Sequence, residues 1–180
     1  MIAEKTFMEG LLVIKPKVFE DERGYFFESF NEQLLEKAGL NAKFVQDNQS
    51  LSQKNVLRGL HFQAPLYAQG KLVRVIKGAV LDVVVDIRKN SATYGKYFPI
   101  ELNEENKTML WIPEGFAHGF LTLHHNTIFY YKCTNYYNKE SEGSISWNDS
   151  DLHIDWKIAS PLVSEKDKAA MAFKNFVSPF

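Results

Sequence analysis

The chain lacks the features that mark several whole classes of protein. Its single cysteine, Cys133, cannot form an intramolecular disulfide, and its first residues lack the regions of a signal peptide, so we expect a reducing, cytoplasmic location. No apolar run approaches the roughly 18 residues of a transmembrane helix, so no such span is expected. The 21 Lys and Arg residues balance the 22 Asp and Glu residues. This balance predicts no basic surface for nucleic acid or for an anionic membrane.

Motifs for nucleophilic catalysis and for phosphate loops are also missing. No serine lies in a nucleophile-elbow motif, and Cys133 has no neighbouring histidine. The Gly70-Lys71-Leu72 segment lacks the upstream residues of a P-loop. A diphosphate would therefore have to bind to side chains such as Arg23, Arg58 and Lys166.

The histidines do not form a metal-binding pattern. The Pro113-x-Gly115-x-x-His118 spacing also occurs in the second motif of cupin-type barrels, where the histidine binds a metal. Those sites also need two histidines separated by one residue and a following carboxylate, whereas His61 is followed by Phe62 and Gln63. The remaining histidines have no ligand spacing: His124, His125 and His153. We therefore expect no metal, and His118 is either a packed barrel residue or a substrate contact.

Aromatic residues are abundant and favour β-structure. The chain has 14 Phe, 8 Tyr and 3 Trp among 180 residues, and such side chains suit half-buried pleated sheets. Apolar or alternating runs of strand length fill most of the sequence, for instance residues 12–18, 25–30, 71–76, 81–87, 107–112, 116–123 and 127–134. No helical crossover, repeat or linker interrupts them. We predict one domain, residues 1–180, built as an antiparallel sandwich or barrel.

Alternation within two of these runs assigns side chains to opposite faces. In residues 81–87 one face has Leu81, Val83, Val85 and Ile87, and the other has Asp82, Val84 and Asp86. One side of this strand is expected to be core. In residues 127–134 the same rule places Phe129, Tyr131 and Cys133 together.

Only two short helices are predicted. The first covers residues 31–38, is capped by Asn31 and is stopped by Gly39. The second runs from Ser164 to about residue 176, with Asp167 at the capping-box position. Both helices are expected at the periphery of the β-structure.

His61 is the first candidate for a catalytic base. It lies in the segment 46–63 (QDNQSLSQKNVLRGLHFQ), whose many polar groups can point into a cavity while its apolar residues pack. An isolated histidine in an apolar strand is more often a hydrogen-bonded structural residue. Arg58, Gln63, Gln69 and Lys71 lie close to it in the sequence, however, and buried charges need partners or ligands.

Tyrosines and one aspartate can complete a proton-transfer site. Tyr130 and Tyr131 lie in a predicted strand, with Tyr136 and Tyr137 just after it, and packing is the ordinary role for most of them. A tyrosine that faces a histidine across a cavity can return a proton to the face opposite the one from which the histidine removes it. Asp167 either supplies charge to the first turn of a helix or orients His61 through its second ring nitrogen.

Several stretches together resemble one family, the cofactor-independent dTDP-4-dehydrorhamnose 3,5-epimerases. The resemblance runs from about residue 10 to about residue 170. It rests on six ordered stretches: DERGYFFESFN from Asp21, FVQDNQSLSQKNVLRGLHFQ from Phe44, AQGKLVRVIKGAVLDVVVDIRKNSATYGKY from Ala68, LWIPEGFAHGFLTL from Leu110, YKCTNYYNKESEGSISWND from Tyr131, and SEKD from Ser164. The resemblance implies an all-β, cupin-like antiparallel jelly-roll sandwich with a few short peripheral helices.

The resemblance also implies roles for particular residues. The family's base matches His61, its dyad aspartate matches Asp167, the lysine near the keto oxygen matches Lys71, and the opposing acid matches Tyr131. Substrate-binding positions carried over in the same way are Arg23, Glu28, Gln46, Asn48, Arg58, Lys71, His118, Glu142 and Lys166. Family members are typically homodimers with an exchanged strand, so by analogy Arg23 and Glu28 serve the neighbouring subunit's site. The departures, Tyr97 where Trp is frequent and Lys157 where Pro is common, concern only packing or nucleotide stacking.

The resulting hypothesis is an isomerase that needs no cofactor. A 4-keto sugar has acidified C–H bonds at C3 and C5, so one enolate-type mechanism can invert both centres. The expected reaction converts dTDP-4-dehydro-6-deoxy-D-glucose to dTDP-4-dehydro-L-rhamnose, for L-rhamnose in surface polysaccharide. Three alternatives stay open: an epimerase of C3 alone, a non-catalytic nucleotide-sugar-binding barrel, and a metal-dependent cupin oxygenase.

Overall fold

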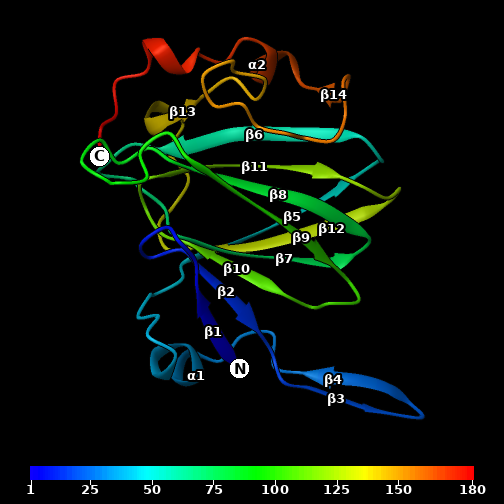
Figure 1. Cartoon of the computed structure of the whole chain (residues 1–180). Helices are drawn as coiled ribbons and strands as arrows, with labels where there is room; N and C mark the ends of the chain where they lie inside the picture. The colour runs from blue at the N-terminus through cyan, green and yellow to red at the C-terminus, as the bar shows by residue number, and fades with distance from the viewer.

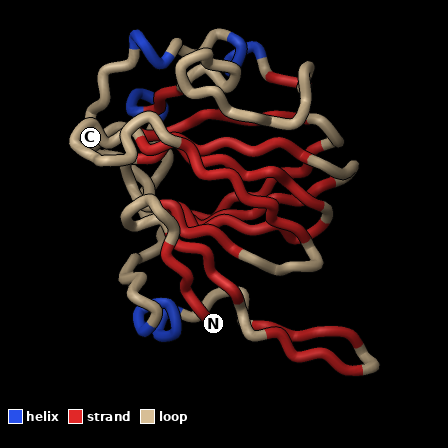
Figure 2. The backbone as a smooth tube through the Cα atoms, viewed as in Figure 1, coloured by secondary structure: helices blue, strands red, loops and turns tan.

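Two antiparallel sheets face each other in the structure, a computed structural model that describes residues 1–180 (Figure 1). The first sheet has the strand order β1 (Ile2–Lys5), β2 (Leu12–Lys15), β10 (Met109–Ile112), β7 (Lys71–Lys77), β12 (Thr127–Cys133) and β5 (Gln46–Ser52). The second has the order β13 (Glu142–Ser144), β6 (Val56–Gln63), β11 (Phe116–Thr122), β8 (Ala79–Asp86) and β9 (Tyr97–Asn103), and β14 (Leu162–Val163) pairs with β6 in parallel. Figure 2 shows the strands as two layers with the helices outside them. The all-β sandwich with short peripheral helices is confirmed.

A two-stranded hairpin projects from the sandwich near the N-terminus. It consists of β3 (Val18–Asp21) and β4 (Gly24–Phe27), and Figure 1 shows it extending away from both sheets. Its strands expose the large apolar side chains of Phe19, Tyr25 and Phe26. The strand predicted over residues 12–18 is wrong as one element. It is divided into β2 and β3 at Pro16, which has no N–H to donate to a neighbouring strand.

The faces of β8 are assigned correctly by alternation, but both are buried. Val84 belongs to the apolar cluster between the sheets, whereas Val83 and Val85 belong to a second cluster on the outer side of the second sheet. Residues from the C-terminal part of the chain, such as Leu152 and Trp156, cover that outer side. The expected core side is therefore confirmed, and the other face is buried as well, because a single strand's pattern does not reveal what covers its other face.

The two predicted helices have different outcomes. Helix α1 (Glu32–Lys37) begins after Asn31, whose side chain accepts a hydrogen bond from the Leu34 N–H, and its prediction is confirmed. Helix α2 (Glu165–Lys168) is a single turn, so the helix predicted from residue 164 to about 176 is wrong in length. Ser164 caps it as expected, but Met171 forms a bridge with Ile145, and only the 3₁₀ turn η2 (Phe173–Asn175) follows. Pairing with the sheet replaces the helix there.

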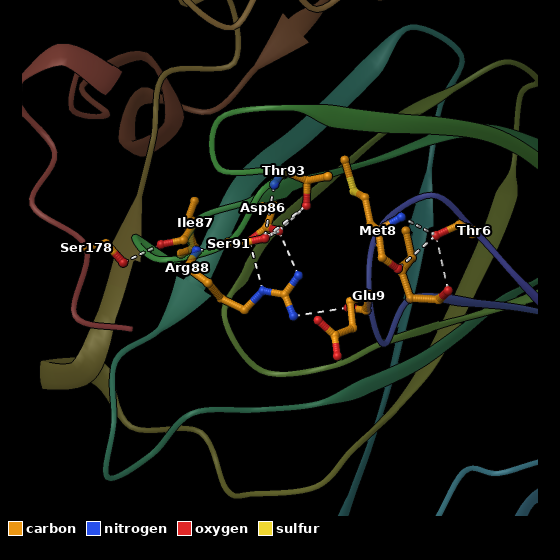
Figure 3. A network of polar contacts seen from close by, with 10 residues as sticks. Thr6, Met8, Glu9, Asp86, Ile87, Arg88, Ser91, Thr93 and Ser178 are labelled. Atoms are coloured by element: carbon orange, nitrogen blue, oxygen red, sulfur yellow. Dashed lines mark hydrogen bonds and ion pairs between the residues drawn. The ribbon is translucent and has the colours of Figure 1, made fainter.

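The N-terminal loop is tied to the sandwich near Asp86, at the end of β8 (Figure 3). Its buried carboxylate accepts hydrogen bonds from Arg88, Ser91 and Thr93, while Arg88 also donates to the carbonyl of Glu9. Burial raises the pKa of Asp86, but these hydrogen bonds outweigh burial and lower it to about 2. Arg88 thus links the N-terminal loop to the turn after β8, and Asp86 fixes its guanidinium group. None of the helices in the chain has the length and apolar composition to cross a membrane.

Candidate active site

A cavity of about 710 Å³ lies between the two sheets. This volume is in the range of ordinary small-molecule sites. Strands β5, β6, β7, β11 and β12 and the start of α2 contribute its walls. Eight of the residues that the sequence singles out line it: Asn48, Arg58, His61, Lys71, His118, Tyr131, Lys166 and Asp167.

His61 and Asp167 form a hydrogen-bonded pair at one wall of this cavity. His61 Nε2 lies 2.6 Å from Asp167 Oδ1, and the side chains are 30% and 4% exposed. The parallel pairing of β14 with β6 brings α2, and with it Asp167, next to the histidine. Burial raises the pKa of Asp167. Hydrogen bonds from His61, Ser164 and the Gly59 backbone lower it by more, so the net pKa is below the ordinary value. An ionised carboxylate therefore orients the His61 ring and leaves Nδ1 as its free nitrogen.

The second histidine of the cavity faces the first across two paired strands. His118 of β11 lies opposite His61 of β6 in the register, so both side chains lie on the same face of the sheet. The strands approach closely here because Gly59, at φ +132°, has no Cβ, and a Cβ would lie 2.5 Å from the Gly119 Cα. His118 Nε2 lies 2.8 Å from Oδ2 of the fully buried Asp82.

Lys71 and Tyr131 come from the facing sheet. Lys71 Nζ lies 5.9 Å from the centre of the Tyr131 ring. Burial lowers the pKa of Lys71 and raises the pKa of Tyr131, and neither side chain forms a hydrogen bond or an ion pair within the chain. The cavity therefore contains an ammonium group and a phenol that are both free to contact a ligand.

Further polar side chains lie at or near the rim of the cavity. Glu142 forms an ion pair with Lys166, at 2.6 Å, and accepts a hydrogen bond from Tyr137. Burial raises the pKa of Glu142, but its bonds to Lys166 and Tyr137 outweigh this and leave the pKa below its ordinary value. Gln46 donates to Asn48 on β5 but does not line the cavity.

Two predicted binding residues lie away from this cavity. Arg23 is at the tip of the projecting hairpin, where its 85% exposed side chain pairs with Asp21 (Figure 1). Glu28 follows the same hairpin, is exposed, and accepts a hydrogen bond from Asn31. The structure does not bring these two residues to the cavity of their own chain.

No group of three or more His, Cys, Asp or Glu side chains is arranged to hold a metal ion. His61 has Asp167 as its carboxylate partner and His118 has Asp82. Each partner occupies the Nε2 atom that a metal could use. The absence of a metal from the reaction stays a prediction.

Comparison with known proteins identifies the family. The family model described as dTDP-4-dehydrorhamnose 3,5-epimerase matches residues 5–175. The chain belongs to this family. It is 56% identical over 172 residues to the dTDP-4-dehydrorhamnose 3,5-epimerase of Salmonella typhimurium, covering 94% of each chain. This family membership confirms the isomerase class expected from the sequence.

Solved structures of dTDP-4-dehydrorhamnose 3,5-epimerase family members have the same fold. The enzyme of Elizabethkingia anophelis superposes with a TM-score of 0.91 at 54% identity, and each chain is covered to 96%. A dTDP-6-deoxy-D-glucose-3,5-epimerase of Legionella pneumophila, solved in complex with dTDP-4-keto-L-rhamnose, gives a TM-score of 0.92 at 47% identity, with coverage of 97% and 94%. The cupin-like jelly roll is therefore confirmed by this family's structures.

The sequence analysis missed three residues in or beside the cavity: Asp82, Phe120 and Phe129. Alternation assigns Asp82 only to a strand face, and its partner His118 lies 36 residues away in the sequence, beyond the reach of a local pattern. Phe120 and Phe129 line the cavity with stacked rings, 4.2 Å between centres. A carboxylate that alternates with valines in a buried strand was the one available signal for Asp82.

Proposed function

We propose that the chain epimerises dTDP-4-dehydro-6-deoxy-D-glucose at C3 and C5 to give dTDP-4-dehydro-L-rhamnose. The observation that supports this most directly is that the His61–Asp167 pair and Tyr131 line one cavity from opposite sheets. A sugar ring between them would have a base on one face and an acid on the other. Membership of the family provides the independent support.

His61 is the base in this proposal. Its free Nδ1 removes the proton from C3 or C5, and the electron pair of the C–H bond moves into an enolate whose negative charge lies on the C4 oxygen. Asp167 holds the imidazole and stabilises the imidazolium that forms. A positioned base of this kind contributes about 100- to 10,000-fold to the rate.

Lys71 stabilises the enolate. Its ammonium group is influenced by the charges of Glu142 and Asp82 but forms no ion pair with either, so it is available to the C4 oxygen. A fixed donor placed where charge develops contributes about 3 to 4 kcal/mol in enzyme sites of this type. The charge is already in place before the reaction, so little reorganisation accompanies proton removal.

Tyr131 is the acid. Its raised pKa keeps the phenol protonated, so that it can donate a proton to the carbanion carbon from the face opposite His61. The carbon centre is thereby inverted, the C4 carbonyl re-forms, and His61 and Tyr131 return to their starting states by exchange with solvent. The same sequence at the second carbon completes the double epimerisation.

The nucleotide portion binds at the rim. Arg58 and Lys166 supply positive charge for the diphosphate, and Asn48, His118 and Glu142 supply polar contacts. Gln46 lies next to Asn48 on β5 and extends this polar surface.

A homodimer is part of the proposal. Strand β5 is an edge strand whose outer side has no partner in the chain, and the projecting hairpin exposes apolar side chains. Docking of one subunit's hairpin near the other's cavity would cover both and would bring Arg23 and Glu28 to that site. We place the enzyme in the cytoplasm, in the supply of L-rhamnose for surface polysaccharide, without cofactor.

Turnover in heavy water, followed by NMR of the sugar protons, tests the function. We expect deuterium at both C3 and C5 together with the L-rhamno product. Deuterium at C3 alone would assign the C3-only reaction, and no deuterium at either carbon would leave a binding protein. His61→Ala should abolish exchange at both carbons, whereas the exposed control His124→Asn should not change it.

A further inference from the structure

Asp82 and Asp86 lie on the same face of β8 and are both fully buried, but their surroundings differ. The carboxylate of Asp86 accepts five hydrogen bonds, from Arg88, Ser91 and Thr93 (Figure 3). The carboxylate of Asp82 has one partner, His118, at its Oδ2, and its buried Oδ1 has none. Burying a carboxyl group with so few partners costs stability, so the fold gains little from Asp82.

The other aspartate of the cavity is also better satisfied than Asp82. The Asp167 carboxylate bonds to His61, and the Asp167 backbone N–H donates to Ser164 Oγ at the start of α2. This bond to the helix cap defines the backbone position of Asp167 independently of the histidine. Asp82, in contrast, has the imidazole of His118 as its one hydrogen-bond partner, and its charge acts on Lys71 without a direct bond.

We propose that Asp82 is a positioning residue that fixes His118 as the Nε2–H tautomer, so that Nδ1 accepts a hydrogen bond from a ring hydroxyl of the sugar. This inference rests on the proposed function, because it assumes a sugar in the cavity. A carboxylate oxygen only accepts hydrogen bonds, so the His118 Nε2 that faces it must donate, and the neutral ring then has its lone pair on Nδ1. His118 thus becomes an acceptor for the ligand.

The surroundings of His118 leave no other group to set the tautomer. Its side chain is 8% exposed and its ring is stacked on Phe129, with 6.1 Å between centres. The titratable and charged groups on the elements around it are Arg58 and His61 of β6, Lys71 of β7, Asp82 of β8 and Tyr131 of β12. Of these only Asp82 forms a hydrogen bond with the ring.

The test uses Asp82→Asn with Asp86→Asn as its matched control from the same strand face. An asparagine amide can donate to Nε2, which moves the ring hydrogen of His118 to Nδ1 and converts the acceptor into a donor. Nitrogen-15 NMR of the ligand-free protein, at a pH where the imidazole is neutral and with His118→Gln for assignment, reports the tautomer without any turnover. We expect Nε2–H in the parent and in Asp86→Asn, and Nδ1–H in Asp82→Asn.

Activity and stability provide the second readout. Asp82→Asn should lower kcat/KM by roughly 10- to 100-fold, as for other groups that orient a functional imidazole, with an unchanged or higher Tm. Asp86→Asn should lower Tm and leave the kcat/KM of the folded enzyme unchanged. A Tm loss in Asp82→Asn as large as in Asp86→Asn, with the His118 tautomer unchanged, would mean a purely structural role and would overturn the proposal.

Sugar nucleotides without the C2 or the C3 hydroxyl identify the contact. With deuterium incorporation at C5 as the measure, one of these analogues should react more slowly than substrate in the parent enzyme but should show no additional loss in Asp82→Asn. Equal additional losses in parent and variant for both analogues would overturn the hydroxyl contact. An inactive parent with the expected tautomers would instead refute the proposed function, so the two failures are distinguishable.

Discussion

His61 and Tyr131 lie on strands of opposite sheets, β6 and β12, and line the same cavity. Asp167 bonds to the His61 ring, burial raises the pKa of Tyr131, and Lys71 lies near the Tyr131 ring. This arrangement allows a proton to leave one face of a sugar ring and to be replaced from the other. Inversion, rather than simple exchange, depends on the two residues being on opposite sides.

Tyr131→Phe should separate exchange from inversion. The variant keeps His61, so protons at C3 and C5 still exchange with deuterium, but the acid for the opposite face is lost. We expect product formation to fall by about 100-fold or more, while deuterium enters recovered substrate. NMR of substrate and product after turnover in heavy water measures both. Tyr130→Phe is the matched control, because the Tyr130 hydroxyl bonds to Asp47 and is not in the cavity; equal losses in both variants would contradict the assignment.

Lys71 should define the basic limb of the pH profile. Burial lowers its pKa from 10.5, whereas burial raises the pKa of Tyr131 from 10.0. As pH rises, the ammonium therefore loses its proton at a lower pH than an exposed lysine would, and activity decreases with it. In Lys71→Arg the charge persists, so the basic limb of kcat/KM should move to higher pH even if the maximum is reduced. A limb that stays in place in Lys71→Arg would assign it to another group.

Asp86 should make the fold sensitive to acid. Its pKa in the folded state is about 2, against an ordinary value of 3.8, so its contribution to stability is complete above pH 3.8 and is lost as pH falls towards 2. This difference corresponds to about 2 kcal/mol of unfolding free energy near neutral pH. Asp86→Asn should therefore be less stable than the parent at pH 6, and the gap should narrow in acid. Urea unfolding at several pH values measures this, with the exposed Asp151→Asn expected to match the parent throughout.

Mixing two defective variants should restore activity if the hairpin serves the neighbouring subunit. Arg23→Ala would damage the partner's site, and His61→Ala damages the site of its own chain. In mixed dimers one site has both defects and the other has none, so about a quarter of the sites should become active after random re-pairing. Steady-state rates before and after denaturation and joint refolding measure the recovery. Absence of recovery, with mixed dimers demonstrated by tagged subunits, would place Arg23 in its own chain's site or outside any site.

Local patterns are sufficient for much of the architecture. The Asn31 cap locates α1, and alternation assigns Phe129, Tyr131 and Cys133 to one side of β12, where Phe129 and Cys133 are buried and Tyr131 lines the cavity. These features depend on neighbours within a few residues, which a sequence displays directly. The helix expected beyond Lys168 fails because Met171 pairs with Ile145, a contact between distant segments that local propensity does not encode.

The amino-acid sequence by itself determined the strand-rich class and the chemical types of the site residues. For Asp167 it left two roles open, a charge at a helix start or a partner of His61. The tertiary structure alone decided that Asp82 bonds to His118, that both faces of β8 are buried, and that Arg23 and Glu28 lie outside their own chain's cavity. The physical reason is that periodicity reveals which side of a strand a residue occupies. Which surface covers that side depends on packing between segments far apart in the chain.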